Sequence, residues 1–293
     1  KYFNFEISKF TFFSKEDVSF SQLINQNIFD LAIICVPDHL HFYFLKQILM
    51  KKIHTLVVKP FVLKKSQAKT LTALEKKYGL ICRVEHHKRY DPSNLYLKDQ
   101  IQNQKLGKIN HFLVQYSQSK VMPNEIFKSW FKKSNIINYI GIHYLDLAYF
   151  LTGYQPKILN SLELKNNENK IIGNILNISW TKTKNKKKDN FTQTLILNLN
   201  EPLNTPVPSR QKINLLFERG RVDIDQDYRG ISQIIESENL NYINPQFSKV
   251  FNLEKNQSIY VYGIESIFYY IVMINNLKNN TKYFYLDLNP SFN

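Results

Sequence analysis

The sequence predicts the α/β fold class, with a parallel sheet domain followed by an α+β domain that carries a large, mainly antiparallel sheet. Within residues 1–90, short apolar runs alternate with helical stretches, which is the order of a parallel sheet covered by helices. Within residues 91–293, strand-like runs follow one another without helices between them, which indicates antiparallel pairing. We therefore expect a domain boundary near residue 90.

Continuous apolar runs in the first part are typical of parallel strands buried on both faces. They are residues 30–37, 55–58 and 80–85. Helices are expected at 39–52 and 64–78, and Gly79 after the second one is a typical helix terminator.

The second part begins with a helix near Asp91-Pro92, followed by a strand that runs to Ser117 and by a helix over 136–151. Five further strands are expected, at 157–164, 173–182, 193–199, 212–218 and 221–225. The lysine-rich run 182–188 lies between two of them and is interpreted as a hairpin tip. A helix over 264–277 completes the pattern.

Composition restricts the class of protein. The chain has 293 residues, 43% of them apolar, and a formal charge of +15, which suits anionic partners but is spread along the sequence. No focused basic helix suggests nucleic-acid binding. Cys35 and Cys82 lie in apolar runs without metal-ligand spacing, so we expect no metal site and a reducing compartment. No apolar run approaches the ~20 residues of a membrane span, and a cytoplasmic location is expected.

Polar residues follow the three expected parallel strands, where open parallel sheets bind their ligands. They lie in the segments 36–41, Lys59-Pro60 and 85–92, the last of which is dense in titratable side chains. A lysine at a strand end is also explained as a solvated cap.

A further group lies on the helix expected over 136–151. Spacings of four and three place Tyr139, His143 and Asp146 on one helix face. A single helical histidine is more often structural than catalytic. If this face points at the strand-end lysine, however, the group could transfer protons.

At these residues the sequence resembles the Gfo/Idh/MocA oxidoreductase family. The matching motifs are Pro37 to His41, Lys59-Pro60, 87–92 and Gly141 to Asp146, in the family's order. Segments such as 84–92, 116–120 and 221–230 also resemble the D-galacturonate reductase-like branch.

The resemblance implies a Rossmann-type domain that binds NAD(P) and a second domain that binds a sugar or sugar acid. It implies catalytic roles for Lys59 and His143, with Tyr139 beside them. The nicotinamide end of the cofactor would be lined by Val36, Pro37, His41, Lys59, Pro60 and His87. For the substrate we expect contacts from Arg89, Lys120, Trp130 and Asp146.

Three departures from the family pattern stand out. Val58 replaces a glutamate before the lysine, and Tyr139 replaces an aspartate that many members have four residues before the histidine. The first glycine of the sequence is Gly79, so no GxGxxG turn precedes the strand at residue 31 to hold a pyrophosphate. We interpret the sequence as truncated at its N-terminus, with a divergent protein that binds dinucleotide poorly as the alternative.

Three functions remain open from the sequence. The first is reduction or oxidation of a sugar acid such as D-galacturonate, and the second is a sugar-nucleotide or cyclitol dehydrogenase of the same fold. The third is a pseudo-oxidoreductase that acts in protein contacts. The resemblance further implies a homo-oligomer formed through the large sheet.

Overall fold

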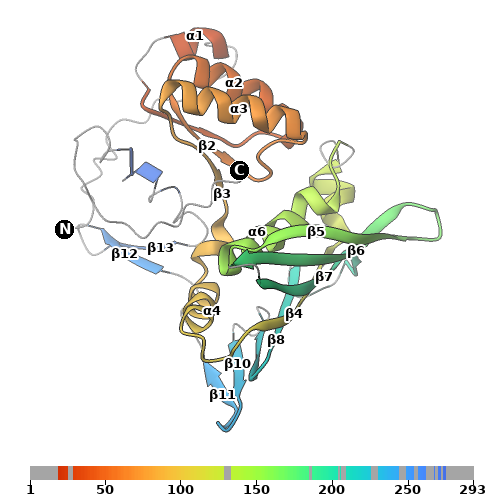
Figure 1. The fold of residues 1–293 in the computed structure, drawn as a ribbon. Helices are drawn as coiled ribbons and strands as arrows, with labels where there is room; N and C mark the ends of the chain where they lie inside the picture. Colours follow the sequence, from red (N-terminus) through yellow and green to blue (C-terminus); the bar gives the residue numbers. More distant parts are fainter. Residues whose placement is uncertain are drawn as a thin grey trace.

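The computed structural model describes residues 19–25, 29–128, 133–184, 187–203, 205, 209–225, 230–243, 249–253, 257–261, 267, 270, 271, 273 and 274. These residues form a three-stranded sheet in the first part of the chain, an eight-stranded sheet in the second, and a separate two-stranded sheet (Figure 1).

The first sheet has three parallel strands in the order β1-β2-β3. Its strands are β1 (Leu31–Ile34), β2 (His54–Val58) and β3 (Cys82–Glu85). The helices around it are α1 (Phe20–Asn25), α2 (His41–Met50) and α3 (Lys65–Tyr78). Apolar side chains from sheet and helices form one core, in which Leu45, Leu49, Val57 and Leu71 are fully buried. As expected, α3 ends at Gly79, whose φ of 63° lies in the left-handed region that favours glycine.

Short helical turns lead out of two strands of this sheet. The 3-10 turn η1 (Asp38–Leu40) follows β1 and leads into α2, while η2 (His87–Tyr90) follows β3. Helix α4 (Pro92–Gln102) begins after η2 with a proline, which suits the first turn of a helix because its missing N–H would have no partner there.

The second sheet has eight strands in the order β11-β10-β9-β8-β4-β7-β6-β5. Their bounds are β4 (Ile109–Ser119), β5 (Gln155–Lys165), β6 (Ile171–Lys184), β7 (Lys187–Glu201), β8 (Ser209–Phe217), β9 (Gly220–Asp225), β10 (Gly230–Ile235) and β11 (Asn241–Ile243). Every neighbouring pair is antiparallel except β4 and β7. The predicted fold class is therefore confirmed.

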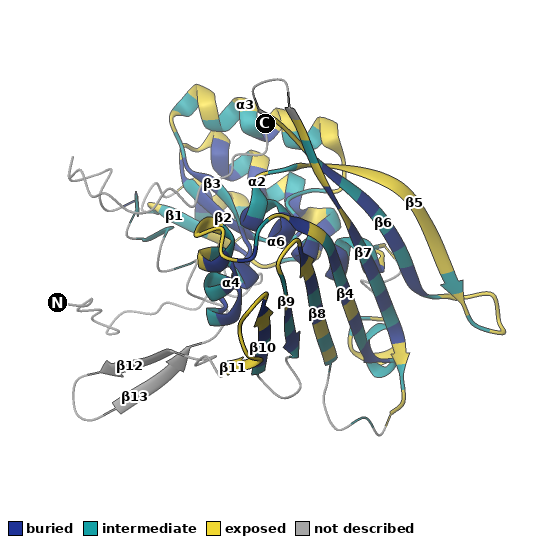
Figure 2. Ribbon diagram, turned by 60° about the horizontal axis from the view of Figure 1, so that its bottom comes forward, coloured by how far each residue is buried: buried dark blue, intermediate teal, exposed yellow. Residues whose placement is uncertain are grey.

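One face of the large sheet is covered by helix α6 (Ile142–Thr152). Its side chains Tyr144 and Leu147 are fully buried against strand residues such as Phe112 and Leu195. Burial alternates along the central strands, whereas β5 at the sheet edge is exposed along nearly its whole length (Figure 2). This alternation is what a sheet with one covered face requires.

The structure differs from the sequence-based expectations in several elements. The helix expected over 136–151 begins with a π-helical turn, η4 (Ile137–Gly141). A second π-helical turn, η3 (Met122–Ile126), lies in the segment after β4. Strands β10 and β11 were not expected, nor were β12 (Lys249–Leu253) and β13 (Gln257–Val261), which pair with each other. The expected helix over 264–277 lies mostly outside the described residues.

The lysine-rich hairpin tip is confirmed, since β6 and β7 pair up to Lys184 and Lys187. Among the described residues, none of the helices has both the length and the apolar character that crossing a membrane requires.

Candidate active site

The C-terminal ends of β1 and β2 are joined by the side chain of His41, at the start of α2. Its Nδ1 lies 2.6 Å from the carbonyl oxygen of Pro60, and its Nε2 lies 2.8 Å from the carbonyl oxygen of Val36. The ring is fully buried. His41 therefore fixes the segment after β1, which includes Pro37, against the segment that carries Lys59.

Lys59 leaves β2 toward the π-helical turn η4. Its Nζ donates a hydrogen bond to the backbone carbonyl oxygen of Tyr139 and lies 4.5 Å from the centroid of the Tyr139 ring. Burial lowers the pKa of Lys59 to about 8, while the negative charges of Asp38 and Glu85 raise it. An ammonium with this pKa is mostly charged at neutral pH and can still release its proton.

His143 lies on the first turn of α6, 7% exposed, with its ring 4.7 Å from the ring of His87. Its Nδ1 is buried without a hydrogen-bond partner among the described residues. Burial lowers the pKa of His143 well below its ordinary value, and the nearby positive charges of Lys59 and His87 lower it further. The free protein therefore holds a neutral imidazole here at pH 7.

Tyr139 lies on η4, two residues before Gly141. A π-helical turn bonds residue i to residue i+5, so the regular spacing of an α-helix does not apply here. A Cβ at Gly141 would lie 3.2 Å from Cδ1 of Leu197 on β7. The glycine thus lets the turn approach the sheet closely. Burial raises the pKa of Tyr139, so its hydroxyl stays protonated at neutral pH.

Arg89 and Asp146 bind each other behind this group. The guanidinium Nε and Nη2 donate to the two carboxylate oxygens of Asp146 at 2.7 and 2.5 Å, and the residues are 7% and 1% exposed. Nε2 of His86 lies 3.4 Å from Oδ1 of Asp146. Arg89 and Asp146 were both expected from the sequence to contact the substrate. In the structure they form a buried ion pair, which leaves their polar atoms little capacity for a substrate. This arrangement suits a role in bracing the site.

Two other residues, Lys120 and Trp130, were expected to contact the substrate. The backbone N–H of Lys120 donates to the carbonyl oxygen of Glu201 just past the end of β4, and none of the described side-chain contacts joins Lys120 to Lys59 or His143. Trp130 lies outside the described residues.

Sequence reasoning missed Asp38 and His86. Asp38 is 3% exposed, and its Oδ2 accepts a hydrogen bond from Oγ of Ser134 at 2.6 Å. His86 is 8% exposed, and its Nδ1 has no partner among the described residues. Both residues belong to strand-end segments that the sequence marks as polar, and this polarity was the available signal.

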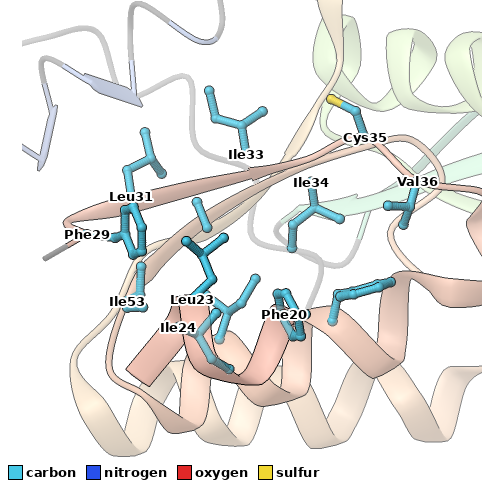
Figure 3. A pocket seen from close by; sticks show the side chains of 13 residues that line it. Phe20, Leu23, Ile24, Phe29, Leu31, Ile33, Ile34, Cys35, Val36 and Ile53 are labelled. Atoms are coloured by element: carbon cyan, nitrogen blue, oxygen red, sulfur yellow. The ribbon is translucent and has the colours of Figure 1, made fainter. Parts of the chain in front are cut away.

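An apolar cavity of about 370 Å³ lies beside β1, between that strand and helices α1 and α2 (Figure 3). Its lining side chains are hydrocarbon apart from the thiol of Cys35, and they include Phe20, Phe29 and Ile33. Such a lining offers no charge or hydrogen bond to a phosphate. Within the described part of the chain, no group of three or more His, Cys, Asp or Glu side chains is placed to hold a metal ion.

Comparison with known proteins relates the chain to one family of oxidoreductases. Residues 4–86 match the family described as the Gfo/Idh/MocA oxidoreductase family, NAD-binding Rossmann fold. The chain is 31% identical over 132 residues to the uncharacterised oxidoreductase YdgJ of Escherichia coli K12, a match that covers 45% of this chain and 38% of that protein. These findings support the Gfo/Idh/MocA oxidoreductase family for this chain. The matched region spans less than two-fifths of the relative's length.

Solved structures share the fold. A dehydrogenase (MviM) of Clostridium difficile matches with a TM-score of 0.64 at 18% identity, over 92% of this chain and 75% of that one. An inositol dehydrogenase homologue of Azotobacter vinelandii, complexed with NADH and myo-inositol, matches with a TM-score of 0.65 at 14% identity, over 76% of this chain and 59% of that one. At these identities the likeness shows the fold.

Proposed function

We propose that this chain acts as an NAD(P)-dependent oxidoreductase, as its relation to the Gfo/Idh/MocA family suggests, and transfers hydride between nicotinamide and a sugar or sugar acid. The observation that supports it most is the pairing of Lys59 with His143 at the C-terminal edge of the parallel sheet. There the ammonium is close enough to lower the pKa of the imidazole, and ligands of open parallel sheets bind at this edge.

The residues at this edge suit the nicotinamide end of the cofactor. The unpartnered Nδ1 of His143 gives the site a buried polar atom that a bound group could satisfy. Val36, Pro37, Pro60 and His87 would hold the ring end, with Lys59 beside it, and the fully buried His41 would keep the two strand ends in place. The pyrophosphate end is different, because no glycine precedes Gly79 and the cavity beside β1 is apolar. Whether the sequence is truncated or divergent stays a prediction.

The cofactor, when bound, would supply or accept the hydride. Lys59 would donate a hydrogen bond to the substrate oxygen and stabilise the charge that grows on it during reduction. A neutral His143 would accept the hydroxyl proton during oxidation and return it during reduction. The pKa directions thus favour Lys59 as the charged hydrogen-bond donor and His143 as the group that exchanges the proton with the substrate.

The charges around His143 favour an acidic substrate over a neutral one. Beside burial, the basic groups Lys59, His87, Lys88 and His86 lower the pKa of His143, and the two lysines carry positive charge. The carboxylate of Asp146 is already bound to Arg89. A carboxylate on the substrate would offset this positive charge, so a uronic acid such as D-galacturonate is the first compound to test.

Two alternatives have support of their own. A cyclitol or sugar-nucleotide dehydrogenase would use the same Lys59 and His143 on a ring hydroxyl. A pseudo-oxidoreductase that acts through protein contacts is favoured by Val58, which stands where the family pattern has a glutamate before the lysine. For either function, we propose a homo-oligomer in which a second copy covers the exposed edge strand β5, where Ile158 and Leu162 are each 59% exposed.

Calorimetric titration of NADH and NADPH into this chain tests the proposal. We expect binding that weakens several-fold in Lys59→Met, and no change in the matched variant Lys46→Met on the outer part of α2. Turnover of NADH with D-galacturonate, and of NAD+ with myo-inositol and a UDP-sugar, then separates the substrates. The same titration is made with a chain extended at its N-terminus. If neither chain binds nucleotide at millimolar concentration, the dehydrogenase function is excluded, and the pseudo-oxidoreductase that acts through protein contacts is the remaining function.

A further inference from the structure

The ammonium of Lys59 has no charged hydrogen-bond partner among the described residues. It is partly buried, its hydrogen-bond acceptor is the backbone carbonyl of Tyr139, and the residue before it is Val58. Removing an ammonium from water destabilises its charged form. An acidic group close to Lys59 is therefore needed if the lysine is to stay charged at neutral pH.

Asp38 occupies a suitable position at the neighbouring strand end. Strands β1 and β2 run parallel with Ile34 opposite Val57, so the segments that leave them lie at the same edge of the sheet. Asp38 begins η1 at that edge and is 3% exposed. Its carboxylate accepts hydrogen bonds from Oγ of Ser134 at 2.6 Å and from the backbone N–H of His39 at 3.0 Å.

Two further contacts hold Asp38 and Lys59 in register. The His41 ring contacts the carbonyl oxygen of Val36, two residues before Asp38, and the carbonyl oxygen of Pro60, the residue after Lys59. On the other side, Ser134 is adjacent to Asn135, whose carbonyl oxygen accepts from the backbone N–H of Tyr139 at 2.9 Å. The segments that carry the acid, the lysine and the tyrosine are thus bound to one another in a closed ring of contacts.

We propose that Asp38 is a positioning residue that keeps the ammonium of Lys59 charged, in place of a carboxylate at position 58. Among the acidic groups, Asp38 has the largest effect in raising the pKa of Lys59, followed by Glu85 on β3. The catalytic meaning of this charge rests on the proposed function, but the coupling between the two residues does not.

The ionisable groups around Lys59 come from four elements. Asp38 belongs to η1, Glu85 to β3, Tyr139 to η4 and His143 to α6. Tyr139 and His143 are neutral at pH 7 because burial raises the pKa of the first and lowers that of the second. The carboxylates are therefore the groups that can set the charge of Lys59 near neutrality.

Trace labelling of the free protein with acetic anhydride tests the proposal without cofactor or substrate. The yield at Lys59 is measured by mass spectrometry across pH 5–10, and its midpoint is the pKa of the lysine. In Asp38→Asn we expect this pKa to fall by about one unit, which raises the labelling rate at pH 7 roughly five-fold. Asp38→Ser serves the same comparison if the asparagine variant does not fold.

Two control variants separate charge from architecture. Ser134→Ala removes the hydrogen bond to Asp38 and keeps the carboxylate, so the Lys59 midpoint should stay within a few tenths of a unit of wild type. Asp38→Asn combined with Val58→Glu restores a carboxylate beside the lysine and should restore the midpoint. An unchanged midpoint in Asp38→Asn, or an equal shift in Ser134→Ala, would overturn the proposal. A shift in a chain that does not bind NADH would leave the coupling standing and remove the dehydrogenase function.

Discussion

The ammonium group of Lys59 lies 4.5 Å from the centroid of the Tyr139 ring and donates a hydrogen bond to the backbone carbonyl oxygen of the same residue. One tyrosine thus holds the lysine twice, through its ring face and through its backbone. A ring face attracts a cation without neutralising it. The resemblance to the oxidoreductase family would have placed a carboxylate at this position, which acts on a lysine by charge instead.

This double contact predicts different outcomes for two substitutions of Tyr139. Tyr139→Phe keeps ring and backbone, so kcat/KM for NADH-dependent reduction should stay within about threefold of wild type. Tyr139→Ala loses the ring contact, worth about 0.5–2 kcal/mol, and should lower kcat/KM by about threefold to thirtyfold. Equal losses in both variants would instead indicate a chemical role for the hydroxyl group.

The pKa of Lys59 predicts how the reduction rate depends on pH. Because the charged ammonium is the form that stabilises the substrate oxygen, the rate should fall as the pH rises through about 8. The oxidation rate should stay level down to about pH 6.5, since burial lowers the pKa of His143 below its ordinary value. Steady-state rates in both directions between pH 5.5 and 9.5 check this. Lys59→Arg, which stays charged, should lack the loss near pH 8.

Much of the fold could be predicted from local sequence patterns. Fully buried strands read as continuous apolar runs, as at Leu56 and Val57, and Gly79 marks the end of α3. Strands β10 and β11 were not predicted because they are short, with six and three residues, and partly polar. Their pairing with the sheet, rather than their own pattern, makes them strands.

The candidate site was only partly predictable. Strand ends and helix spacing indicated Lys59 and His143, but which partner each side chain takes depends on contacts distant in sequence. Arg89 and Asp146 are 57 positions apart, and no local pattern shows that they bind each other. The π-helical turn at Tyr139 depends likewise on packing against β7, which sequence periodicity does not contain.

The buried pair of Arg89 and Asp146 predicts a large loss of stability when one partner is removed. Asp146→Asn removes the negative charge that the guanidinium of Arg89, a residue 7% exposed, binds, and the free energy of unfolding should fall by about 3–5 kcal/mol. Urea denaturation measures the change. The matched control is Asp225→Asn, which breaks the more exposed ion pair with Lys212 and should cost less than about 1 kcal/mol. Similar losses in both variants would contradict the bracing role.

The close approach of Gly141 to β7 predicts a coupling with Leu197. Gly141→Ala places a Cβ 3.2 Å from Cδ1 of Leu197, so the turn or the leucine must shift, at a cost of about 1–3 kcal/mol. The same shift should weaken NADH binding, because η4 carries the carbonyl that holds Lys59. Leu197→Ala should lose less stability in the Gly141→Ala background than in wild type, and a double-mutant cycle measures this difference. Additive losses would show that the two side chains do not compete for space.

The exposed edge strand β5 predicts self-association through the large sheet. Ile158 and Leu162 are each 59% exposed, and an apolar edge strand left in water favours association. Sedimentation velocity at micromolar concentration should show an oligomer for the wild-type chain and a monomer for Ile158→Lys combined with Leu162→Lys. The control is Tyr242→Lys on β11, at the opposite edge of the sheet, where the side chain is 80% exposed and the oligomer should persist. A monomeric wild-type chain, or an oligomer that only Tyr242→Lys dissociates, would exclude β5 as the interface.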